Sequence, residues 1–215
     1  MGMARRFLVL HGWQNHRPPE HWQHWLVERL RARGEQVLYP QLPSPDDPLL
    51  DDWLDVLRGE LRQLGDGERV VIAHSLGCLL WLRHAALGGD AQPVDRLLLV
   101  CPPSTSTLPA ELATFFPGAD DAAALARSVL RRPELVCTDA DTWCPEGAAA
   151  TYGDALDLDV HTIAGGGHLD IEAGYGAFPA AEQWALTGTF PTAAATTAAT
   201  ARRDGRLEHR ERAAA

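Results

Sequence analysis

A serine at the junction of an apolar strand and an apolar helix is the first residue whose setting suggests chemistry. Ser75 follows the strand-like segment Arg69–Ala73 and precedes Leu76, with Ala73 and Gly77 two positions to either side. A sharp strand–turn–helix strains the central residue, so these flanking positions must be small. The pattern predicts a nucleophile elbow, in which the Leu76 N–H faces a developing oxyanion. The alternative is a serine that only caps the following helix.

A serine hydroxyl is a weak nucleophile at neutral pH until an imidazole takes its proton. His168 follows three glycines after the last strand-like segment, and those glycines allow a tight loop toward Ser75. Two acids, Asp139 and Asp141, follow the strand before it. We favour Asp141 as the partner of His168, because Asp139 adjoins the strand end and can serve the turn. The chain order serine, acid, histidine is that of doubly wound hydrolases.

The loop after the first strand offers a second oxyanion donor. His11-Gly12-Trp13 follows the apolar run Phe7–Leu10, and a His-Gly pair at this point often precedes an oxyanion hole. The backbone N–H of Trp13 is therefore predicted to face the same point as that of Leu76. In the simpler alternative Gly12 only ends the strand and Trp13 packs. We take His11, Gly12, His74 and Trp143 as candidate pocket-lining residues.

Histidines gather near the N-terminus, which raises the question of a metal. His21 and His24 lie three positions apart on a predicted helix, with His11 and His16 before them. No carboxylate completes a compact set, and both the H-E-x-x-H and C-x-x-C patterns are missing from the sequence. We therefore expect no metal site and no cofactor.

The elements that must position these residues alternate between strand and helix. Strand-like runs occur at Phe7–Leu10, Gln36–Tyr39, Arg69–Ala73, Arg96–Val100, Glu134–Thr138 and Asp157–Ile163. Helical spacing of apolar residues is clearest over Leu50–Leu64. This alternation predicts an α/β fold with a parallel sheet of about six strands and helices on both faces. The looser segment from Pro102 to Leu130 would then lie at the carboxyl edge, where it could cover a pocket.

Composition limits the other classes of function. The 215 residues can bury one substantial core, and acidic residues outnumber basic ones 29 to 19, which argues against a nucleic-acid partner. The short apolar run near the N-terminus suits neither a signal peptide nor a membrane span, so we expect a cytoplasmic protein with no membrane partner. We expect one domain over residues 1–187, and a disordered Ala/Thr/Arg-rich tail over residues 188–215.

Motifs spread from Phe7 to Trp184 together resemble those of the retinoblastoma-binding protein 9 and YdeN family of small serine hydrolases. The matching runs are His11–Asn15, Glu20–Gln23, Ala73–Cys78, Asp141–Glu146, Gly167–Leu169 and Gly174–Gly176. One departure is Asp141-Thr142-Trp143-Cys144, where members of the family commonly show Asp-Pro-Tyr-Cys. The acid is kept, but the bulkier Trp143 could reshape the edge of the pocket.

The resemblance implies a three-layer α/β-hydrolase fold with little or no cap domain, and a triad of Ser75, Asp141 and His168. From these residues we expect a serine hydrolase that cleaves a small ester, in preference to an amide, through an acyl-enzyme. The family takes its name from a binding partner, so the alternative is a protein-binding module on a hydrolase scaffold, with incidental hydrolase activity. The substrate and the oligomeric state are beyond the sequence.

Overall fold

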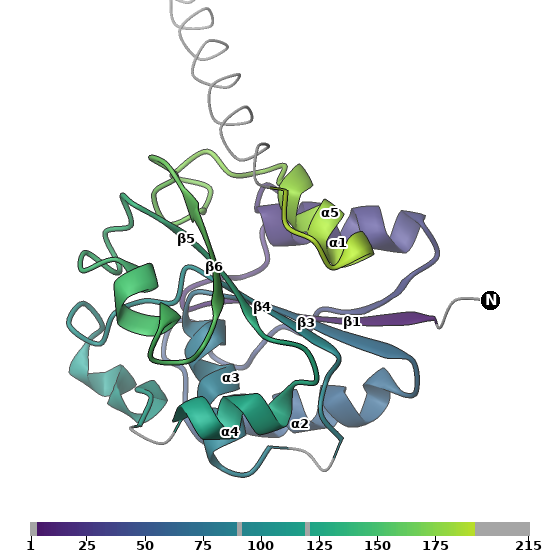
Figure 1. The fold of residues 1–215 in the computed structure, drawn as a ribbon, viewed down its shortest axis with the longest axis horizontal. Coiled ribbons are helices and arrows are strands. Elements are labelled where there is room, and N and C mark those ends of the chain that lie inside the picture. The colour runs from purple at the N-terminus through teal and green to yellow at the C-terminus, as the bar shows by residue number, and fades with distance from the viewer. Residues whose placement is uncertain (1–3, 90–91, 119–120, 192–215) are drawn as a thin grey trace, which may run out of the picture.

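A parallel sheet of six strands forms the centre of the molecule, in the order β2-β1-β3-β4-β5-β6 (Figure 1). The structure is a computed structural model, and it describes residues 4–89, 92–118 and 121–191. The strands are β1 (Arg5–Leu10), β2 (Gln36–Leu38), β3 (Glu68–His74), β4 (Arg96–Val100), β5 (Glu134–Thr138) and β6 (Asp159–Ile163). The helices are α1 (Trp22–Ala32), α2 (Leu50–Leu64), α3 (Leu76–Ala86), the 3₁₀ turn η1 (Ala110–Phe115), α4 (Asp121–Ser128), the π turn η2 (Ala149–Gly153) and α5 (Pro179–Thr187).

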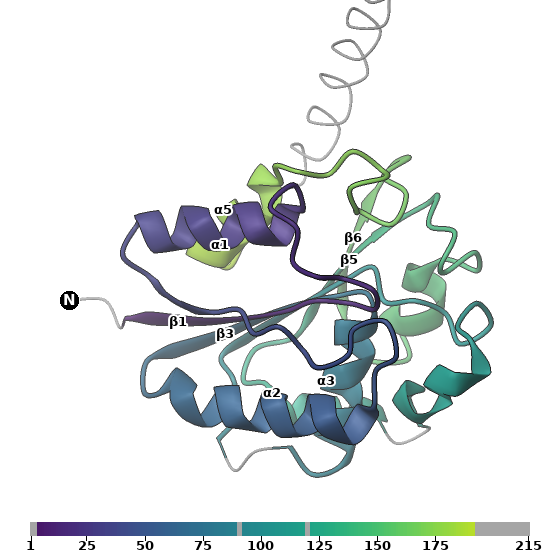
Figure 2. The ribbon, with the colours of Figure 1, turned by 180° about the vertical axis from the view of Figure 1, so that it is seen from behind.

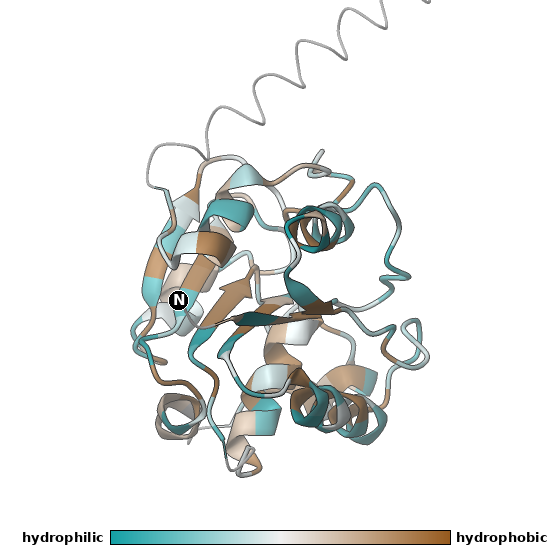
Figure 3. Cartoon of the chain, turned by 90° about the vertical axis from the view of Figure 1, so that its right-hand side faces the viewer, coloured by the Kyte–Doolittle hydropathy of each residue, from teal (hydrophilic) through white to brown (hydrophobic). Residues whose placement is uncertain are grey.

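Helices cover both faces of the sheet, as the strand–helix alternation predicts. Helices α1 and α5 lie on one face, and α2, α3 and α4 lie on the other (Figures 1 and 2). Successive side chains of a strand point to opposite faces, so Val70 and Ile72 of β3 join the core under α1 and α5. Val71 and Ala73 of the same strand join the core under α2 and α3. Figure 3 shows the apolar strands between the two helix layers.

Helix α2 shows how the sequence pattern becomes packing. Trp53, Leu54 and Leu57 recur at helical spacing and are buried against the sheet, while Asp51 and Asp52 occupy the solvent-exposed side of the first turn. Acidic residues at a helix N-terminus interact favourably with the helix dipole. The helix ends where Gly65 takes φ 73°, a conformation that glycine adopts without strain.

The strand order reverses direction between β1 and β3. The chain runs outward from β1 through α1 to β2, then crosses back through α2 to β3. At such a point the loops after the two strands leave the sheet edge in opposite directions and open a crevice at the carboxyl ends. The residues after β1 and β3, namely the Gly12–Trp13 loop and Ser75, therefore meet at the natural ligand site of this fold.

The packed part of the chain extends past the predicted domain boundary at residue 187. Phe190 lies beyond the predicted boundary at residue 187, yet it is buried, stacks on the ring of His161 at 4.8 Å and lies 6.2 Å from that of Phe178. An aromatic side chain gains free energy from such burial, so the chain packs on the domain through this residue. The rest of the predicted tail, residues 192–215, lies outside the described residues.

No helix among the described residues is long and apolar enough to cross a membrane.

Candidate active site

Ser75 occupies the turn between β3 and α3 in a backbone conformation that residues other than glycine rarely adopt. Its backbone has φ 55° and ψ −127°, a strained region for a residue other than glycine. Its N–H donates to the carbonyl of Val100 at 2.9 Å, and its own carbonyl accepts from the N–H of Cys78 at 2.9 Å. A Cβ on Gly77 would lie 2.7 Å from the carbonyl oxygen of His11, so only glycine fits there. These backbone contacts therefore keep Ser75 in the strained conformation that the elbow pattern predicts.

A chain of hydrogen bonds runs from Ser75 to Asp141. The Ser75 hydroxyl lies 2.9 Å from Nε2 of His168, and Nδ1 of His168 lies 2.9 Å from both carboxylate oxygens of Asp141. A carboxylate can only accept, so Nδ1 carries the proton, and Nε2 is free to accept from the serine hydroxyl. Asp141 and His168 are 5% and 9% exposed. The structure thus assembles three residues that are separated by 93 positions in the chain.

The two candidate acids point in different directions. Asp139 accepts the backbone N–H of Gly165 at 2.6 Å and so ties the strand end to the histidine loop. Asp141 also accepts the N–H of Trp143 at 2.9 Å, which fixes its carboxylate toward His168. On the histidine side, Gly167 takes φ 57°, which lets the loop turn back toward Ser75. Of the two acids, Asp141 contacts the imidazole.

The two N–H groups predicted to stabilise an oxyanion, those of Leu76 and Trp13, belong to segments next to Ser75. Helix α3 begins at Leu76, so the Leu76 N–H belongs to the first turn, where no carbonyl of the same helix can accept it. Gly12 approaches so closely that a Cβ there would lie 2.6 Å from Cβ of Ser75. The next N–H along the chain, that of Trp13, makes no backbone hydrogen bond within the described ranges. Both candidate donors therefore come from segments that touch the serine.

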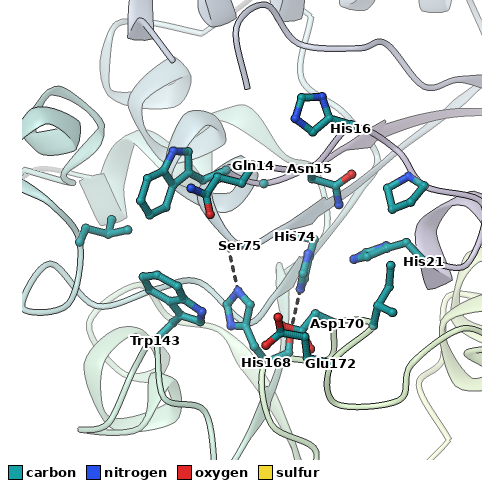
Figure 4. A pocket seen from close by; sticks show the side chains of 15 residues that line it. Gln14, Asn15, His16, His21, His74, Ser75, Trp143, His168, Asp170 and Glu172 are labelled. Carbon is teal, nitrogen blue, oxygen red and sulfur yellow. Dashed lines mark hydrogen bonds between the residues drawn. The ribbon is translucent and has the colours of Figure 1, made fainter. Parts of the chain in front are cut away.

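A cavity of about 450 Å³ opens over Ser75 (Figure 4). Trp143 lies on one side of the Ser75–His168 pair, and His74 and His21 lie on the opposite side. The indoles of Trp13 and Trp143 meet edge to face at 6.0 Å. The lining consists of Gly12, Trp13, Gln14, Asn15, His16, Pro18, His21, His74, Ser75, Leu108, Trp143, His168, Asp170, Ile171 and Glu172.

Three of the four candidate lining residues reach this cavity, and the fourth does not. Gly12, His74 and Trp143 line it, but the ring of His11 is buried behind the loop and stands edge-on to the ring of Trp53 at 5.7 Å. Strand β1 ends at Leu10, and the ring of His11 turns toward Trp53 of α2, whereas strict alternation along the strand would place it with Phe7 and Val9 on the opposite face. His11 is therefore a core residue of the loop.

Some lining residues were not foreseen. Asp170, Ile171 and Glu172 lie two to four positions after His168, and this closeness in sequence to a candidate catalytic histidine is the signal that points to them. Among the described residues of the segment 102–130, Leu108 is the one in the lining. The residues of η1 are not in the lining, and Leu112 and Phe115 pack in the core. Nothing in the spacing of this segment singles out Leu108.

Burial keeps three histidines around the site neutral, namely His11, His21 and His74. Desolvation lowers the pKa of His11 and of His21 to about 4, and lowers that of His74 well below its usual range. His21 uses Nδ1 to accept the N–H of Gln23, the first-turn donor of α1, at 3.1 Å. His74 uses Nε2 to donate to the backbone carbonyl of His168 at 2.9 Å. Each neutral ring thus has a structural hydrogen bond beside the cavity.

Among the described residues, one group of three potential metal ligands lies close together: Cys101, Asp141 and His168. Two of these are already hydrogen-bonded to each other through Nδ1. All three are buried, and burial raises the pKa of the Cys101 thiol well above its usual range, which disfavours the thiolate that a metal would bind. The donors are better suited to holding the histidine than to holding an ion.

Comparison with known proteins agrees with this geometry. The family model described as serine hydrolase matches residues 7–186. The chain belongs to the serine hydrolase family. It is 29% identical over 182 residues to YdeN of Bacillus subtilis, covering 82% of this chain and 92% of YdeN. The predicted resemblance to YdeN and the α/β-hydrolase fold are thus confirmed.

Solved structures of relatives share the fold of this serine hydrolase. The crystal structure of the Bacillus subtilis YdeN gene product superposes with a TM-score of 0.74 at 26% identity, covering 86% of this chain and 97% of that one. A YdeN-like hydrolase from Pectobacterium atrosepticum gives 0.62 at 19% identity, over 85% and 90% of the two chains. An esterase domain from a Rhodothermus marinus protein gives 0.61 at 16% identity, over 85% of each chain.

Proposed function

We propose that this serine hydrolase cleaves small carboxylic esters through an acyl-enzyme. The observation that carries the proposal is the hydrogen-bond chain from Asp141 through His168 to Ser75, whose last two members line an open cavity. A hydroxyl, an imidazole and a carboxylate at these distances match the requirements of nucleophilic acyl transfer. Membership of the serine hydrolase family supports the same reaction class.

In the proposed mechanism, Ser75 attacks the ester carbonyl carbon as His168 Nε2 takes the hydroxyl proton. The N–H groups of Leu76 and Trp13 stabilise the resulting oxyanion. His168 then gives the proton to the departing alkoxide, so an alcohol leaves and Ser75 carries the acyl group. Water repeats the sequence with His168 as base and releases the acid. Asp141 holds the imidazole in the Nδ1–H tautomer throughout and stabilises the imidazolium.

The cavity favours a small substrate. A volume of about 450 Å³ is near the lower end for ligand pockets, and the edge-to-face Trp13–Trp143 pair gives one wall an apolar surface. Polar groups, among them Asn15, Asp170 and Glu172, line the rest. We therefore expect a compact apolar acyl group with a small alcohol. An ester is favoured over an amide, because an alkoxide leaves more readily than an amide nitrogen.

The test combines a covalent probe with turnover. We expect a fluorophosphonate to label the native protein once per chain, with the adduct on Ser75 by peptide mass spectrometry. p-Nitrophenyl esters of increasing acyl length should be cleaved fastest at short length, and Ser75→Ala should abolish both reactions. Amides with the same acyl groups should be cleaved more slowly than the esters.

Ser106→Ala is the matched control, because Ser106 is an exposed serine whose hydroxyl bonds to Glu146 rather than to a histidine. It should label and turn over like the wild type. Labelling that persists undiminished in Ser75→Ala, or an unreactive wild type, contradicts the proposal and favours a binding module on a hydrolase scaffold.

A further inference from the structure

His11 lies at the point where the loop after β1 meets the loop after β2. Its side chain is completely buried, and both ring nitrogens have partners on the backbone. Nδ1 lies 2.8 Å from the carbonyl oxygen of Gly12, and Nε2 lies 2.9 Å from the backbone nitrogen of Leu42. One imidazole therefore joins the Gly12–Trp13 loop to the chain that leaves β2.

These two contacts decide where the ring carries its proton. The Leu42 N–H can only donate, so Nε2 of His11 must accept and is unprotonated. The side-chain amide nitrogen of Gln41, 3.1 Å from Nε2, donates to the same atom. A neutral imidazole has one N–H, so the proton is on Nδ1 and points at the Gly12 carbonyl, which can only accept. The Leu42 loop thus selects the tautomer that holds Gly12.

Holding the carbonyl of Gly12 also fixes the N–H of Trp13. These two groups belong to one planar peptide unit, and in a trans peptide the C=O and the N–H point in opposite directions. The His11 ring, which packs on Trp53 of the core, holds the oxygen on the core side of the loop. The N–H is consequently directed to the other side, where Gly12 itself touches Ser75. Without the imidazole, the peptide could rotate and withdraw its donor.

We propose that His11 is a positioning residue which locks the Gly12–Trp13 peptide so that the Trp13 N–H serves as an oxyanion donor. This inference rests on the proposed hydrolase function and deepens it. His11 touches no substrate, because its ring is outside the cavity lining. Its effect is therefore on the oxyanion of the transition state, and kcat is the kinetic constant that reports it.

Two conservative substitutions separate the two ends of the imidazole. In His11→Asn the side-chain nitrogen can occupy the place of Nδ1 and donate to Gly12, but nothing reaches Leu42. In His11→Gln the side-chain oxygen can occupy the place of Nε2 and accept from Leu42, but the donor to Gly12 is lost. We expect His11→Asn to keep kcat within about tenfold, and His11→Gln to lower kcat by roughly 10²-fold with little change in KM, since loss of one oxyanion donor has this magnitude.

The experiment measures kcat and KM for a short-chain p-nitrophenyl ester, together with the urea midpoint of each variant and the inhibition constant of a trifluoromethyl ketone, which forms an oxyanion adduct with serine. His24→Asn is the control and should match the wild type, because His24 lies on helix α1 and is not in the cavity lining. In His11→Gln the affinity for the ketone should fall in parallel with kcat. A merely structural role would make kcat follow stability in both variants.

Ring ¹⁵N chemical shifts in the wild type supply a second measurement that needs no variant to fold. They should show His11 protonated at Nδ1 and unprotonated at Nε2. An Nε2–H tautomer overturns the inference, as does equal kcat in wild type and His11→Gln, while both outcomes leave Ser75-dependent hydrolysis standing. A wild type with no Ser75-dependent reaction overturns the proposed function and this inference together.

Discussion

The ring of His74 donates Nε2–H to the backbone carbonyl of His168 at 2.9 Å, so the residue before Ser75 holds the loop that carries His168. The contact is buried, and the two rings lie 5.0 Å apart. Ser75 and His168 are therefore linked twice, once through their side chains and once through this neighbouring imidazole.

His74→Leu should weaken both stability and turnover. The substitution leaves the buried His168 carbonyl without its donor, which costs about 1–3 kcal/mol of unfolding free energy. We expect kcat to fall with it, because the histidine loop loses a restraint. His74→Gln places a side-chain N–H near the position of Nε2 and should recover part of both losses. Urea unfolding and ester turnover measure them, and equal behaviour of the leucine and glutamine variants would show that the hydrogen bond is unimportant.

The two acids should respond differently to the same substitution. Asp141→Asn presents an amide to His168, favours the wrong imidazole tautomer and should lower kcat by up to ~10⁴-fold with the fold intact. Asp139→Asn should weaken only the hydrogen bond to Gly165 and cost about 1 kcal/mol of stability. Steady-state kinetics and thermal unfolding of both variants check this, and the reverse pattern would move the acid of the triad to Asp139.

Acid should destabilise the fold through its buried histidines. Burial lowers the pKa of His11 and of His21 from 6.5 to about 4 in the folded chain. Below pH 6.5 the unfolded chain binds protons at these histidines, whereas the folded chain does not. The free energy of unfolding therefore keeps its full value above pH 6.5 and decreases as the pH falls toward 4. Each histidine accounts for about 2 kcal/mol of loss at pH 5, since one pKa unit corresponds to about 1.4 kcal/mol.

His21→Asn isolates one of these contributions. Asparagine is a good N-cap and can still accept the Gln23 N–H, so stability near pH 7.5 should be preserved. The loss between pH 7 and pH 5, measured by urea unfolding, should be smaller in this variant. His16→Asn is the control, because the side chain of His16 is 61% exposed, and its curve should parallel that of the wild type. If the stability of His21→Asn fell between pH 7 and pH 5 as steeply as that of the wild type, the prediction would be wrong.

The position of Phe190 sets the expected result of truncation. A chain that ends after Pro191 keeps the contacts of Phe190 with His161 and Phe178, and we expect its melting temperature and turnover to match those of the full chain. A chain that ends after Thr187 exposes the surface that Phe190 covers and should lose about 1.5–3 kcal/mol of stability. Thermal melts of the two truncated chains decide the matter, and identical melts would place the end of the domain at residue 187.

Local patterns in the sequence were enough to predict the elements and the order of the candidate site residues. Strands β4 and β5 have the predicted bounds, and α2 spans the predicted residues, because burial follows the apolar period along each segment. Ser75 and His168 were predictable for a related reason. A strained elbow and a glycine-rich loop each need particular small residues close by in the chain, so both leave a local signature.

Only the tertiary structure decided the direction of side chains and the contacts between distant loops. Asp139 and Asp141 are two positions apart in one turn, and the choice between them depends on how that turn lies beside the histidine loop. The neighbours of His11 in the sequence predict a cavity-lining residue. Its ring is instead buried in the core, where Nε2 accepts the N–H of Leu42, 31 positions away. Such contacts depend on how the strands are ordered in space. The sequence of one segment therefore does not specify which distant segment it will contact.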